Sequence, residues 1–99
     1  MAKHVVNWDR SARDCLKQVL QYIRMDSPQN AQKIKAEVRT LVNSLPEHPF
    51  RFPKDKFRIA NSGEYRALIV YSLRISYYIG AEEIRIVRVR HTKQGPLFY

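Results

Sequence analysis

Residues 73–91, LRISYYIGAEEIRIVRVRH, combine the clearest β-strand pattern of the chain with its densest positive charge. Between positions 73 and 79 apolar and polar side chains alternate, which is typical of a strand with one buried and one open face. Gly80 lies in GAEE at positions 80–83, where we expect a tight turn. The segment 84–89 is apolar enough for a central strand and is followed by further charge. The stretch therefore predicts a β-hairpin with arginines on its open face.

The chain is strongly basic, and the excess charge is uneven. It has 99 residues, enough for one domain over 1–99, with 18 Lys and Arg against nine Asp and Glu, a formal net charge of +9. Residues 50–99 hold ten basic and four acidic side chains (+6), and residues 1–49 hold eight and five (+3). Charge that concentrates with a predicted sheet favours an anionic partner such as RNA, DNA, the ribosome or an acidic protein.

The first half of the chain predicts a strand followed by two helices. Residues 4–8 suit a short strand at a sheet edge. Apolar residues recur at spacings of three and four over 12–23 and again over 31–45, which indicates two amphipathic helices. Ser27 and Pro28 separate them as the cap and the first residue of the second helix. A connection this short predicts an antiparallel helical hairpin.

The second half predicts a loop and then strands. Residues 46–56 contain three prolines and predict an irregular crossing, 57–60 could begin a strand, and 64–71 is strand-like. We therefore expect an α+β fold: an N-terminal strand, an antiparallel helical hairpin, and a three- to four-stranded, mostly antiparallel sheet with the helices on one face. Cys15 falls on the first apolar stripe, where an unpaired cysteine is usually buried.

Several function classes lack their sequence signals. There is no glycine-rich phosphate loop, so nucleotide hydrolysis and a bound cofactor are not expected. His4, His48 and His91 have no metal-ligand spacing with one another or with Cys15, so we expect no metal. The chain has neither a signal peptide nor an apolar run of about 18 residues, which predicts a cytoplasmic protein without a membrane span.

The remaining polar groups suit RNA cleavage. Attack of a ribose 2′-OH on the adjacent phosphate needs a base, an acid, and a cation for the charge of the transition state. Arg74, at the middle of a predicted strand, is our candidate cation, because guanidinium can hold two phosphate oxygens. His91 is the candidate acid or base, since histidine titrates near neutral pH. Further candidates are Arg66, Arg88, Arg90 and Lys93 for phosphate contacts and Tyr78 for base stacking.

Both leading candidates have an ordinary structural interpretation. Arg74 is also explained as a solvated strand residue without a function, because exposed arginines are common on open sheet faces. If Val87 and Val89 face the core, strict alternation turns His91 inward with them, as a structural histidine, unless a strand end or bulge rotates it out.

A set of short segments, taken in order over nearly all of the chain, identifies a family resemblance. The segments are the strand ending in Trp8, Ala12 and Leu16 at A-x-x-x-L spacing, Tyr22-Ile23, Ser27–Ala31, Leu45-Pro46 with Pro49, Leu73–Ile79 and Ile86–His91. With them the chain resembles the RelE/ParE toxins of bacterial toxin–antitoxin modules, also known as plasmid stabilisation proteins. The resemblance implies a small toxin that a cognate antitoxin neutralises with an acidic or amphipathic C-terminal segment.

The family divides by target, and the resemblance carries site residues with it. RelE-like members cut mRNA in the ribosomal A site, whereas ParE-like members poison DNA gyrase. Arg74 resembles the catalytic arginine of a Y-R-L-V-Y strand, with Leu73 in place of the tyrosine or histidine before it. His91 falls near the C-terminal catalytic positions of nuclease members, with Thr92 where a tyrosine follows. The lysine-rich helix that supplies the general base of RelE has no counterpart here.

Three functions follow for comparison. We favour a ribosome-dependent endoribonuclease (an mRNA interferase), with Arg74 on the scissile phosphate and His91, helped by Lys93, moving protons. The alternative is an inhibitor of DNA gyrase without nuclease activity, which apolar exposed helix faces would support. The third is a basic nucleic-acid-binding or regulatory protein that acts in complex with its antitoxin.

Overall fold

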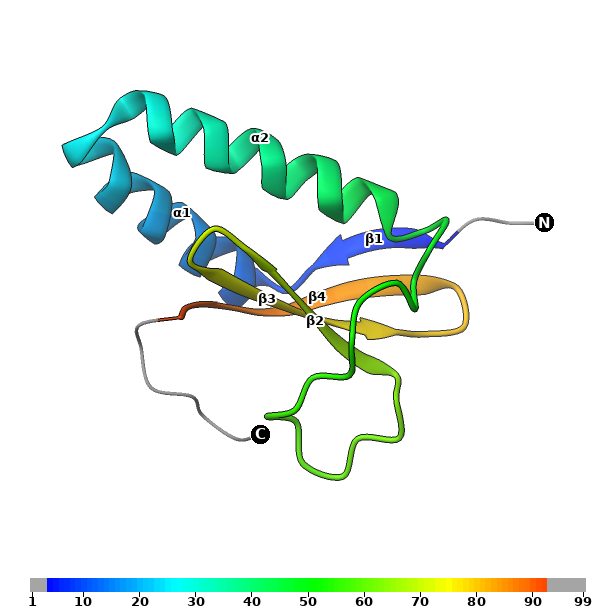
Figure 1. Ribbon diagram of the computed structural model, residues 1–99. Coiled ribbons are helices and arrows are strands. Elements are labelled where there is room, and N and C mark those ends of the chain that lie inside the picture. Colours follow the sequence, from blue (N-terminus) through cyan, green and yellow to red (C-terminus); the bar gives the residue numbers. More distant parts are fainter. Residues whose placement is uncertain (1–3, 93–99) are drawn as a thin grey trace.

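The computed structural model describes residues 4–92 and shows two helices against one face of a four-stranded sheet (Figure 1). In chain order the elements are β1 (Val5–Trp8), α1 (Arg10–Asp26), α2 (Pro28–Ser44), β2 (Tyr65–Val70), β3 (Leu73–Ile79) and β4 (Glu83–His91). The predicted α+β fold is confirmed, including the hairpin at 73–91.

The sheet has the strand order β1-β4-β3-β2, so the last strand of the described chain lies inside the sheet. β1 pairs in parallel with β4, with Val6 opposite Ile84, and the other neighbours are antiparallel. Two parallel strands need a long connection, and the connection from β1 to β4 starts with the two helices. The predicted edge position of the N-terminal strand is confirmed.

The two helix starts use their polar residues differently. The Ser27 Oγ accepts a hydrogen bond from the Asn30 N–H (3.2 Å), and Pro28 is the first helical residue, so the predicted cap of α2 is confirmed. Asp9 precedes α1, but within residues 4–92 its carboxylate caps no helix N–H and accepts a hydrogen bond from Arg85 Nη1 instead (2.8 Å).

The core lies between the helices and the sheet. Its buried side chains are Ala12, Val38, Val42 and Leu45 from the helical half and Leu68, Val70, Leu73, Ile75, Tyr77, Ile84, Ile86 and Val89 from the strands. Tyr77 is fully buried, and its hydroxyl donates to the Pro49 carbonyl (2.8 Å). Burial raises the pKa of Tyr77 to about 12, although the nearby positive charge of Arg66 acts in the opposite direction.

A bulge in β4 sets which side chains face the core. Ser76 is opposite Arg88 and Tyr77 is opposite Ile86, so Val87 is an extra residue in β4. Of the two valines in this strand, Val89 is buried and Val87 is only half-buried. Side chains of β4 therefore do not alternate strictly between the two faces: the alternation shifts by one residue at Val87.

Two expectations are wrong. Cys15 is exposed, because it lies at the border of the apolar stripe of α1 rather than at its centre. Residues 57–60 form no strand; they belong to a loop from 45 to 64 that passes the β2 edge of the sheet. Neither helix in the described chain is long and apolar enough to cross a membrane.

Candidate functional site

The open face of the sheet, opposite the helices, carries a group of arginines. The register of β3 and β4 places Arg74 directly opposite Arg90 and Ser76 opposite Arg88. Residues opposite each other in a sheet project from the same face, and like charges in this position repel. An anion bound between two such guanidinium groups would relieve the repulsion. This arrangement therefore favours phosphate.

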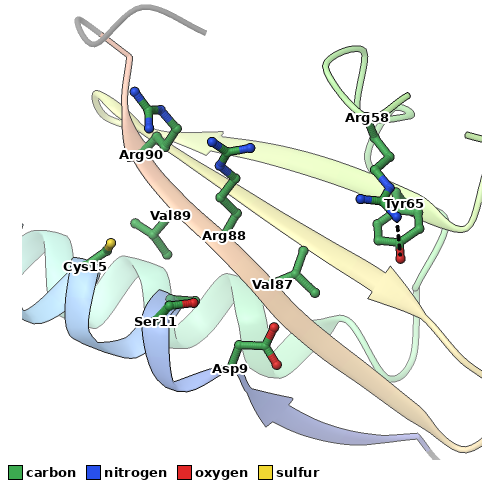
Figure 2. Close-up of a pocket in the computed structure, with 10 residues that line it drawn as sticks. Asp9, Ser11, Cys15, Arg58, Tyr65, Val87, Arg88, Val89 and Arg90 are labelled. Atoms are coloured by element: carbon green, nitrogen blue, oxygen red, sulfur yellow. Dashed lines mark hydrogen bonds between the residues drawn. The ribbon is translucent and has the colours of Figure 1, made fainter. Parts of the chain in front are cut away.

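A groove of about 530 Å³ passes along β4, between the start of α1 and the open face of the sheet (Figure 2). It is lined by Arg58, Tyr65, Arg88 and Arg90, by Val87 and Val89, and by Asp9, Ser11, Ala12 and Cys15 of α1 and the residue before it. In Figure 2 the guanidinium groups of Arg88 and Arg90 project to the same side of β4. We call this the arginine groove. Arg74 lies next to it, across from Arg90.

The acidic residues beside the groove are already paired. Asp9 accepts from Arg85 Nη1 (2.8 Å), and Glu83 accepts from Arg85 Nη2 (3.0 Å) and from the Asn7 amide (2.8 Å). These contacts, led by the Asn7 hydrogen bond, lower the pKa of the Glu83 carboxyl, so it stays ionised. Arg85 thus pairs with both carboxylates.

The loop before β2 adds residues that the sequence did not identify as functional. The Cζ of Arg74 lies 4.5 Å from the centre of the Phe57 ring. Arg58 covers the Tyr65 ring at 4.1 Å and donates from Nη2 to the Tyr65 hydroxyl (3.2 Å), the dashed line in Figure 2. The adjacent K-F-R at 56–58 was the available signal, because neighbouring basic and aromatic residues are typical of RNA-binding surfaces.

The predicted site residues divide between the two faces. Arg74, Arg88 and Arg90 lie together on the open face. Tyr78 is on the same face and packs against Tyr65, with ring centres 4.9 Å apart. The Tyr78 ring, our candidate for base stacking, is therefore half-buried against Tyr65.

Arg66 has a different environment. It is opposite Tyr77, so it projects on the helix side of the sheet. Its Nε donates to the Gly63 carbonyl (2.8 Å) and its Nη1 to the Phe52 carbonyl (3.1 Å), and it lies over the Phe50 ring. Arg66 thus ties the loop to β2.

His91 and Arg74 point to opposite faces. His91 is opposite Leu73, a core residue, and is half-buried at the end of β4. After the bulge, Val89 and His91 both project to the helix side of the sheet. The inward direction of His91 is the one expected if it alternates in phase with Val89. Lys93 lies outside the described residues. Within residues 4–92, no cluster of three or more His, Cys, Asp or Glu side chains could hold a metal ion.

Two helices packed on a four-stranded, mostly antiparallel sheet are the architecture of the RelE/ParE class of toxins. Residues 6–96 match the family model described as ParE toxin of type II toxin–antitoxin system, parDE, and the chain belongs to this family. It is thus a toxin component of a type II toxin–antitoxin system.

Individual relatives agree with this assignment. The chain is 32% identical to Toxin RelE2 of Caulobacter vibrioides over 91 residues, which are 92% of this chain and 96% of the relative. Among solved structures it resembles a chain of the chromosomal ParDE system of P. aeruginosa (TM-score 0.68, 18% identity, 90% and 96% covered). It also resembles a chain of the toxin–antitoxin complex RelBE2 of Mycobacterium tuberculosis (TM-score 0.59, 21% identity, 92% and 93% covered). At these identities the structures establish the fold alone.

Proposed function

We propose that this toxin arrests growth by binding mRNA on the ribosome with the open face of its sheet and cleaving it through 2′-OH attack. The observation that carries the proposal is the directly opposed pair Arg74 and Arg90 beside the arginine groove. Two guanidinium groups on one side of a sheet can both donate hydrogen bonds to phosphate oxygens and balance their negative charge.

In this mechanism the arginines act on the phosphate. Attack of the 2′-oxygen adds negative charge to the phosphate oxygens, and Arg74 with Arg90 would stabilise that charge at the transition state. His91, helped by Lys93, would take the 2′ proton and protonate the 5′-oxygen. Because His91 faces the helix side, the reacting ribose would have to lie at the end of β4, where both faces are within reach.

We also infer that a cognate antitoxin neutralises this chain. The similar solved structures include the RelBE2 toxin–antitoxin complex and a ParDE system. A formal charge of +9 would favour an acidic segment of that partner.

The test of the cleavage proposal is the substitution Arg74→Ala. Induction of the wild-type toxin should arrest growth and produce new mRNA 5′ ends within codons, as mapped by primer extension. Arg74→Ala should abolish both while the free energy of unfolding changes by less than about 1 kcal/mol, since Arg74 is not a core residue. Arg13→Ala, an exposed arginine on α1, is the matched control and should remain toxic.

Inhibition of DNA gyrase is the second candidate, and α1 provides the observation in its favour. Tyr22 and Met25 are 78% and 86% exposed and lie one helical turn apart, which makes a small apolar surface for a protein partner. If mRNA remains intact while the purified toxin blocks gyrase supercoiling, this candidate replaces the first. Tyr22→Ala with Met25→Ala should then abolish toxicity, whereas Arg74→Ala should not.

A further inference from the structure

We propose that Phe57 is a positioning residue that holds the Arg74 guanidinium in the orientation needed to bind phosphate. The inference rests on the proposed function, in which Arg74 contacts RNA. It assigns a role to the loop before β2, which neither the sequence nor the family match links to Arg74.

The first step is the contact itself. Arg74 Cζ lies 4.5 Å from the Phe57 ring centre, well within the range of a cation–π interaction. A ring against one flat face of guanidinium leaves the N–H groups at its edge available, and these are the donors that bind phosphate oxygens. The same ring prevents a base from stacking on that face. Phe57 would therefore make Arg74 a phosphate contact rather than a stacking surface.

The second step is the rigidity of the loop that carries Phe57. Asp55 is 2% exposed, its Oδ1 accepts from the Phe57 N–H (3.1 Å), and its own N–H donates to the Tyr65 carbonyl (2.9 Å). Asn61 joins the two ends of the loop: its Nδ2 donates to the Asp55 and Tyr65 carbonyls, and its Oδ1 accepts from the N–H groups of Gly63 and Tyr65. These bonds fix the Phe57 backbone relative to β2, which is hydrogen-bonded to β3 and Arg74.

The third step concerns the other cation at this ring. Lys56 Nζ lies 5.2 Å from the Phe57 ring centre, farther than Arg74 Cζ. Lys56 is exposed and directly precedes Phe57 in the loop, so it supplies a control for a loss of positive charge beside the same ring. If Phe57 acts through Arg74, then Lys56→Gln should leave the orientation of Arg74 unchanged.

The experiment is a double-mutant cycle with purified full-length toxin and a fluorescent single-stranded RNA. Phe57→Leu removes the aromatic face at similar volume, and we expect it to weaken RNA binding roughly two- to tenfold. Arg74→Gln should weaken binding at least as much, and the double variant should bind no more weakly than Arg74→Gln alone. Phe57→Tyr, which keeps the ring, should restore wild-type affinity. Independent, multiplying effects of the two substitutions would overturn the inference, as would wild-type affinity in Phe57→Leu.

A second readout does not depend on RNA. The Arg74 Nε–H resonance in an NMR spectrum senses the Phe57 ring current, so it should move in Phe57→Leu and stay in place in Lys56→Gln. If the wild-type toxin fails to bind RNA, the proposed function fails, and this resonance still decides whether Phe57 orients Arg74. An unmoved resonance in Phe57→Leu would contradict the inference. Should Phe57→Leu not fold, Phe57→Met provides the same comparison.

Discussion

At the scale of single residues, Tyr77 links the core to pH. Its hydroxyl is buried, hydrogen-bonded to Pro49, and has a pKa of about 12. A phenol in the unfolded chain ionises near pH 10, so the fold favours the protonated form. Its contribution to stability is complete below about pH 10 and is lost as the pH rises toward 12.

We therefore expect the free energy of unfolding, measured with urea, to fall between about pH 10 and pH 12. Tyr77→Phe should reduce this decline, and at neutral pH it should destabilise the fold by about 1 kcal/mol through the lost hydrogen bond. Tyr22→Phe, at an exposed position, should keep the wild-type pH profile. An unchanged alkaline decline in Tyr77→Phe would contradict the role of this phenol.

The arginines show the limit of sequence-based prediction at this scale. Arg66 and Arg74 occupy the second positions of neighbouring strands, and their sequence contexts look alike. Arg66 is bound to two loop carbonyls on the helix side, whereas Arg74 faces the open side against Phe57. The difference depends on contacts with a proline-rich loop whose path no periodicity predicts. The open-face position of Arg74 follows from alternation in β3, whereas that of Arg88 and Arg90 also depends on the bulge at Val87.

At the scale of elements, the turn between β2 and β3 holds a residue in an unfavourable conformation. Tyr71 has φ +54°, in the left-handed region, and is 52% exposed. Residues other than glycine lose roughly 1–2 kcal/mol there, and asparagine tolerates the region best among those with a side chain.

Tyr71→Asn should therefore stabilise the toxin by about 0.5–1 kcal/mol in urea unfolding. Ser72→Asn, at the neighbouring turn residue without a positive φ, is the control and should change stability little. A destabilised Tyr71→Asn would mean that the packing of the ring outweighs the strain. If the variant is more stable but less toxic, the strained tyrosine belongs to a binding surface.

Elements were easier to predict from the sequence than the sites between them. The two helices, the cap at Ser27 and the hairpin follow from local patterns, and all are present. The bulge at Val87 was not predictable, because an inserted residue in a strand looks like an ordinary apolar position. The expected strand at 57–60 failed because Asp55 and Asn61 fold that segment into a loop through side-chain hydrogen bonds to the backbone.

At the scale of the whole molecule, the formal charge of +9 makes the fold sensitive to anions. Phosphate should raise Tm more than chloride at equal ionic strength, because the proposed anion site in the arginine groove would bind it in addition to the screening of charge. At about five times its Kd the gain is about 1 kcal/mol, or roughly 4–8 °C for a domain of this size. Thermal unfolding of the wild type should show the difference. Arg90→Gln should reduce it and Arg13→Gln should not, and an equal response of all three proteins would argue against an anion site.

The position of β4 also determines when the sheet and the arginine groove can form during synthesis of the chain. β4 is the last described element, yet it separates β1 from β3, so β1 has no neighbouring strand in the sheet until β4 has been synthesised. The arginine groove, which needs β4, α1 and the loop before β2, cannot exist earlier. The groove therefore forms only when β4 has paired with both β1 and β3, so its assembly is a late step in folding.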